Sequence, residues 1–194
     1  MRSIQRRSLT RVVWSFVAVI GVLAGCAVQG TAGSRHTLYD GLPALAADSQ
    51  EVVRVRVDGQ SEVGVETAER SGQSAHTLSE AQVLETWRGD GIGRADAQQS
   101  RLDVGDRIAV RQMGTKSQEM EGELLELGDE YLLFLTPTMI PDAPLDEFYV
   151  TGGMAGIYRV ALTTNGDAEF LRLFDEGDKL PSSIDPSELP ELLG

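Results

Sequence analysis

The sequence predicts a mainly β protein, built as a small antiparallel barrel or sandwich with short flanking helices. Six or seven short apolar segments are separated by turns rich in glycine and proline, and little helix-forming sequence lies between them. This order is typical of small all-β domains. The chain has one cysteine, so no internal disulfide can form and the apolar core must hold the fold.

The first strands are predicted from alternation. Residues 53–58 alternate valine with charged residues, the period of a half-buried strand, and a piece near Val63 and Val65 extends it past a kink at Asp58-Gly59. Residues 76–87 form a longer candidate strand. Its adjacent Val83 and Leu84 favour a bulge or burial of both faces.

The later strands follow turn signals. Strands are expected over 107–111 and over 130–135, and the run Tyr131–Leu135 is apolar on both faces, which is typical of a central strand. Three prolines in residues 136–147 predict an ordered, irregular loop. Strands at 148–150, 157–162 and 168–174 follow, the last two joined by a hairpin at Asn165-Gly166.

Two short helices are expected at the flanks. One covers residues 38–47, with Pro43 near its start and Leu42, Leu45 and Ala46 on one side. The other covers residues 187–193 after an Asp185 cap and Pro186.

The charge is strongly negative and unevenly placed. Four arginines precede the first apolar run, so the rest of the chain carries 13 basic residues against 30 acidic ones, a formal charge of −17. Binding to nucleic-acid phosphates requires clustered Lys and Arg, so we expect no nucleic-acid partner.

The N-terminus has the pattern of an export signal. A basic leader, residues 1–11, precedes the almost wholly apolar Val12–Leu23. Twelve helical residues cover roughly 18 Å, well short of a hydrocarbon core of ~30 Å, so the run favours a cleaved signal over a permanent span. An uncleaved anchor with an incidental cysteine is the alternative.

The motif Leu23-Ala24-Gly25-Cys26, which ends this run, resembles the lipobox of bacterial lipoproteins. The resemblance implies cleavage between Gly25 and Cys26, thioether lipidation of Cys26, and acylation of the new amine by a fatty acid such as palmitate. Two or three acyl chains hold a protein stably at a membrane, where one is marginal. We therefore expect a lipid-anchored protein on the extracytoplasmic face of the cell membrane.

The predicted organisation has three parts: a signal peptide (1–25), a lipid-anchored tether with a possible short helix (26–48), and a single β-rich domain (49–194). Residues 27–36 are small, polar and glycine-bearing, as in flexible tethers. Arg6-Arg7 and Leu9 partly resemble a twin-arginine export signal, although Gln5 and Thr10 depart from it, so that route and general secretion both stay open.

The pattern of strands, glycine turns and terminal helix over residues 51–193 resembles secreted OB-like barrels of the netrin and tissue-inhibitor-of-metalloproteinase type. The resemblance implies the architecture. The cysteine framework of that family is missing here, so its inhibitory activity is not carried over.

No residue pattern predicts catalysis, a cofactor or a metal site. His36 and His76 are the only histidines and are expected to face solvent. The glycine-rich Gly152–Gly156 precedes a strand, which favours a bulge or tight bend over a phosphate loop. Asp90–Asp96 only faintly resembles a calcium-binding loop, and Arg88–Asp90 matches a cell-adhesion tripeptide that often recurs by chance. We read both as turns.

The acidic residues between 119 and 130 are read as a solvated face, although paired carboxylates for acid–base work stay conceivable from sequence. We expect a non-catalytic binding or interaction module for an envelope protein or small ligand. Its expected rim is the Pro137–Pro144 loop with the Gly89–Gly93 turn. The alternatives are an envelope hydrolase with paired carboxylates and a passive surface protein.

Overall fold

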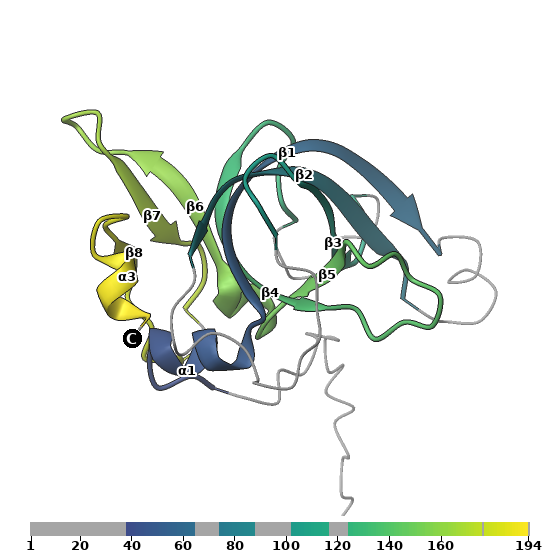
Figure 1. Cartoon of the computed structure of the whole chain (residues 1–194), viewed down its shortest axis with the longest axis horizontal. Coiled ribbons are helices and arrows are strands. Elements are labelled where there is room, and N and C mark those ends of the chain that lie inside the picture. The colour runs from purple at the N-terminus through teal and green to yellow at the C-terminus, as the bar shows by residue number, and fades with distance from the viewer. Residues whose placement is uncertain (1–37, 65–73, 88–101, 117–123, 176, 194) are drawn as a thin grey trace, which may run out of the picture.

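The structure is a computed structural model that describes residues 38–64, 74–87, 102–116, 124–175 and 177–193. Its elements follow the chain around one curved sheet (Figure 1). They are α1 (Leu42–Asp48), β1 (Glu51–Val63), β2 (His76–Trp87), β3 (Arg107–Met113), β4 (Glu130–Pro137), β5 (Glu147–Val150), the 3₁₀ helix η1 (Gly153–Gly156), β6 (Ile157–Leu162), β7 (Ala168–Arg172), β8 (Ser183–Ile184) and α3 (Leu189–Leu192).

Five strands close into a barrel. β1 pairs with both β2 and β4, β2 pairs with β3, β3 with β5, and β5 with β4, so the ring of hydrogen-bonded neighbours is complete. β6, β7 and β8 extend the sheet from β4 outside this ring. The expected small barrel is confirmed. The expectation of a wholly antiparallel barrel is wrong at one place, because β3 and β5 run parallel.

The long β1 pairs with both β2 and β4 and bends along its length. Its register against β2 shifts between Arg54 and Val55 and again between Val57 and Gly59. The first shift leaves Leu84 of β2 unpaired, which is the predicted bulge, and the second is the predicted kink at Asp58-Gly59. Bulges increase strand bending and twist, as closure of a small barrel requires.

Two apolar cores lie on the two faces of β4. Tyr131, Leu133 and Leu135 point into the barrel, where they meet the inward valines of β1. Leu132 and Phe134 point the other way, into a second core covered by α1, α3 and the β6–β8 extension. β4 is therefore buried on both faces, which confirms the prediction of a central strand.

The flanking helices are shorter than expected. α1 begins at Leu42, four residues after the predicted start, and its apolar side (Leu42, Leu45 and Ala46) is buried as predicted. Asp185 accepts hydrogen bonds from the Ser187 backbone and hydroxyl, yet α3 covers only Leu189–Leu192. β8 was not predicted, because two residues are too few to show a period.

The glycine-rich Gly152–Gly156 forms the tight bend that was predicted, a single 3₁₀ turn between β5 and β6. A Cβ on Gly156 would lie 2.5 Å from the Thr151 carbonyl oxygen and 3.2 Å from that of Phe134. Neither carbonyl oxygen can shift away from this Cβ unless β4 or the turn moves.

Gly156→Ala is therefore expected to lower the free energy of unfolding by about 1–3 kcal/mol, the usual cost of overpacking. Urea unfolding followed by circular dichroism measures it. Gly41→Ala is the matched control, since its Cβ would meet nothing closer than 3.6 Å. Equal stability of the two variants would contradict this view of the bend.

Candidate functional site

The outer face of β2, β3 and β5 is the best candidate for a functional surface. In OB-type barrels, ligands bind on the face of strands 2 and 3 and at the loops joining strands 1–2 and 4–5. Here Leu78, Arg111 and Tyr149 form one row across the three strands, and Glu80, Ala109 and Glu147 form the next. Their side chains point outward, because the intervening Val110 and Phe148 lie in the barrel core.

An ion pair joins the two rows. Arg111 Nε donates to Glu147 Oε1 at 2.6 Å, and the two side chains are only 14% and 4% exposed. Charge-assisted hydrogen bonds of this length are strong, and the low exposure keeps water from competing for them. The pair fixes the guanidinium against β5.

Small and hydroxyl-bearing residues surround this pair. Ala109, the smallest side chain of its row, stands between Glu80 and Glu147. The Thr138 backbone N–H donates to the Glu147 carbonyl, which places Thr138 opposite Glu147. The Thr138 hydroxyl is buried and has no hydrogen-bond partner among the described residues. A buried unpaired hydroxyl costs about 1–3 kcal/mol.

His76 lies at the edge of the same face, opposite Met113, and is half-buried, not fully solvent-facing as expected. Burial lowers the pKa of His76 below 6.5, and the charge of Arg111 adds to this effect. Glu147 and a backbone hydrogen bond with Ser74 act in the opposite direction. The imidazole is therefore neutral at physiological pH.

The lowered pKa of His76 predicts a loss of stability in acid. Well above pH 6.5 the imidazole is neutral in both states. As the pH falls from about 6.5 towards the lower folded-state pKa, the unfolded chain takes up the proton first, so stability falls over that range and levels off below it. The urea midpoint of His76→Gln should fall less than that of the wild type between pH 7.5 and 5.5. His36→Gln is the control, and identical pH slopes for His76→Gln and wild type would refute this assignment.

The loop from Thr138 to Asp146, which joins β4 to β5, borders this face. Met139 and Leu145 are 94% and 87% exposed. The loop is nevertheless ordered by two turns, in which Ala143 N–H donates to the Ile140 carbonyl and Glu147 N–H to the Pro144 carbonyl. Asp142 has a φ of 64°, the only positive φ of a non-glycine residue that the described ranges contain. Such backbone strain is common at binding sites.

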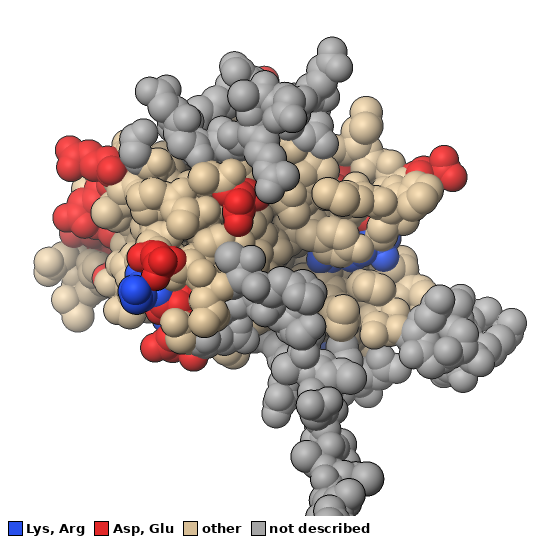
Figure 2. All heavy atoms as spheres, turned by 90° about the horizontal axis from the view of Figure 1, so that it is seen from below, with Lys and Arg blue, Asp and Glu red and all other residues tan. Residues whose placement is uncertain are grey.

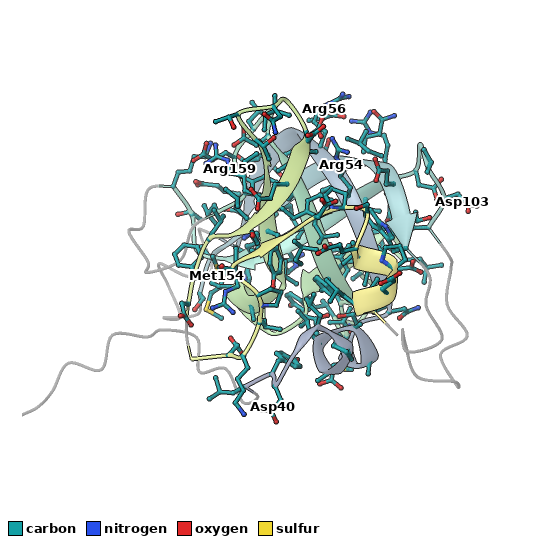
Figure 3. The ribbon with its side chains drawn as sticks, turned by 90° about the vertical axis from the view of Figure 1, so that its left-hand side faces the viewer. Asp40, Arg54, Arg56, Asp103, Met154 and Arg159 are labelled. Carbon is teal, nitrogen blue, oxygen red and sulfur yellow. The ribbon has the colours of Figure 1, made fainter. Side chains whose placement is uncertain are left out.

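Acidic side chains gather elsewhere. Figure 2 shows several of them over the end of the molecule that holds β7 and α3, whereas the other end shows Lys or Arg atoms and a further acid among uncharged residues. Figure 3 shows Arg54, Arg56 and Arg159 at the end of the barrel away from α1. Arg54 pairs with Glu85 and Glu130, and Arg159 with Glu126 and Asp129.

These contacts bear on the acidic residues noted in the sequence. Glu126, Asp129 and Glu130 are bound by arginines. The two buried acids of the described segments, Glu51 and Glu147, belong to opposite faces of the sheet: Glu51 lies opposite the inward Leu135, whereas Glu147 points outward. These two buried carboxylates therefore do not face each other.

Several predicted features fall outside the described residues: Cys26 with the cleavage site at Gly25, His36, the Asp90–Asp96 and Gly89–Gly93 turns, and acids 119–123. Within the described segments, no three His, Cys, Asp or Glu side chains are grouped so as to hold a metal ion. No helix in these segments is long and apolar enough to cross a membrane.

Sequence reasoning identified the loop but missed the Arg111–Glu147 pair. The two residues are 36 positions apart and meet only because β3 and β5 run parallel. No sequence signal marks that pairing. Comparison with known proteins adds no further guide: no family model, no curated protein and no solved structure matches the chain.

Proposed function

We propose that this protein is a lipid-anchored protein of the extracytoplasmic membrane face whose barrel is a non-catalytic binding module for an envelope protein. The observation that carries the proposal is the ordered loop 138–146, which exposes Met139 and Leu145 beside the outer face of β2, β3 and β5.

The loop has the properties of a contact surface. Nearly complete exposure of two large apolar side chains is unfavourable in water, and burial against a partner yields roughly 25 cal/mol per Å² of apolar area. Pro137, Pro141 and Pro144 restrict the backbone, so less conformational entropy is lost when a partner binds. The likeness to ligand-binding OB barrels supports the location by analogy of fold.

The anchor rests on the sequence of residues 1–26. The basic leader, the short apolar run and Leu23-Ala24-Gly25-Cys26 favour lipidation of Cys26, and residues 27–37 lie between that anchor and the barrel. The binding surface would then be presented close to the membrane, within reach of other envelope proteins.

The binding module is tested with a double variant, Met139→Ser with Leu145→Ser. Wild-type protein in detergent-solubilised membranes should capture a defined partner, and the purified partner should bind the double variant at least about tenfold more weakly, as expected for loss of two apolar anchors. Isothermal titration calorimetry measures the affinity.

Leu162→Ser is the matched control, because Leu162 is 75% exposed but lies in β6 outside the barrel ring. It should bind like the wild type. Recovery of no partner, or equal affinities of the double variant and wild type, would contradict the proposal and favour a passive surface protein.

A further inference from the structure

We propose that Arg111 binds a carboxylate group of the partner, with Glu147 as the positioning residue and the 138–146 loop holding an adjacent apolar side chain. This inference rests on the proposed function and names the chemistry recognised at its surface. The group recognised is a C-terminal or acidic side-chain carboxylate.

The guanidinium is fixed and still has free donors. Glu147, 4% exposed, holds Nε at 2.6 Å. No hydrogen bond joins the two terminal nitrogens to another described residue, and the side chain is 14% exposed. An arginine held through Nε presents its terminal nitrogens in a planar fork, the geometry that matches a carboxylate.

The surroundings favour an acceptor ligand. The Arg111 terminal nitrogens can only donate hydrogen bonds, and the Thr138 hydroxyl beside Glu147 is buried without a partner among the described residues. Leu78 and Tyr149 flank Arg111 in its row, and Ala109 is its small neighbour in the next row. A ligand oxygen placed at Arg111 would meet its donors between these side chains.

The acidic character of the whole chain does not prevent such binding. The outward acid of β2, Glu80, lies across Ala109 from Glu147, and its carboxylate is beside Gly59 of β1. Charges more than about 8–10 Å apart in solvent are largely screened at physiological salt. A carboxylate at Arg111 would therefore interact chiefly with the groups that touch it.

The test is a nuclear magnetic resonance titration of the lipidated, detergent-solubilised protein that follows the Arg111 Nε–H signal. The probes are sodium acetate, N-acetyl-leucine and inorganic phosphate, each at constant ionic strength against sodium chloride. We expect saturable shifts with acetate, tighter binding of N-acetyl-leucine because its leucyl group reaches the loop, and no tighter binding of phosphate than of acetate.

Two variants test the site, and neither leaves a buried charge without its counter-ion. Arg111→Gln combined with Glu147→Gln should abolish saturation, followed through the Tyr149 amide signal, while Arg111→Lys should weaken binding about tenfold through loss of the fork. Arg107→Gln is the control: Arg107 lies on the same strand, is 64% exposed and pairs with Asp58.

The inference is wrong if acetate gives no saturable shift, if the double variant still saturates, or if phosphate saturates and acetate does not. These outcomes are independent of partner capture. Capture of a partner that requires Met139 and Leu145, together with an Arg111 Nε–H signal that acetate does not shift, would overturn this inference. The proposed binding module would then still be supported.

Discussion

Replacing Cys26 with serine is expected to release the protein from the membrane. Serine has no thiol for the thioether, so neither the diacylglyceryl group nor the later acyl chain would be attached. Each buried CH₂ contributes ~0.8 kcal/mol, so loss of two or three chains removes essentially all anchoring energy. The described residues supply no membrane-spanning helix to replace it.

Detergent phase partitioning, incorporation of labelled palmitate and the mass of the N-terminal peptide together measure this effect. Wild type should enter the detergent phase, carry label and begin at Cys26, whereas Cys26→Ser should carry no label and leave the detergent phase. Gln29→Ala, just past the lipobox, should behave as wild type. A Cys26→Ser protein that is cleaved normally and equally membrane-bound would refute the lipoprotein assignment.

Glu147→Leu is expected to lower the free energy of unfolding by about 3–5 kcal/mol. The substitution leaves the Arg111 guanidinium largely buried and without its counter-ion, and breaking a buried pair costs this much because the remaining charge is uncompensated. Chemical unfolding of the variant gives the value directly.

The double variant Arg111→Met with Glu147→Leu should recover most of the loss, since replacing a buried pair with apolar groups is often neutral. Lys179→Met is the control on an exposed pair: Lys179 and Asp40 are 78% and 85% exposed, and its loss should change stability little. A Glu147→Leu effect no larger than that of Lys179→Met would contradict the fixed arrangement at the face.

Much of the fold could be predicted because its strands carry local signals. The alternating valines of β1, the doubly apolar run of β4 and the Asn165-Gly166 turn each determine their own element. Closure of the barrel could not be predicted in the same way. The parallel β3–β5 pair depends on contacts between residues far apart in sequence, and the sequence of neither strand indicates which strand it pairs with.

The candidate site shows the same division. Exposure of the proline-rich loop follows from its composition, so the loop was predicted as a rim. Arg111 was placed at the end of a predicted strand and Glu147 at the end of the predicted loop, and no signal linked them, because burial of the pair arises only when β5 inserts between β3 and β4. The site therefore forms only through the order in which the strands pair.

Photo-crosslinking in intact cells tests the central claim of an anchored binding module most directly. A photoreactive amino acid is placed at Met139 or Leu145, and at Leu162 as the control. We expect one crosslinked adduct of the same mass from positions 139 and 145 and none from 162. Absence of an adduct at 139 and 145, or equal adducts at all three positions, would contradict it.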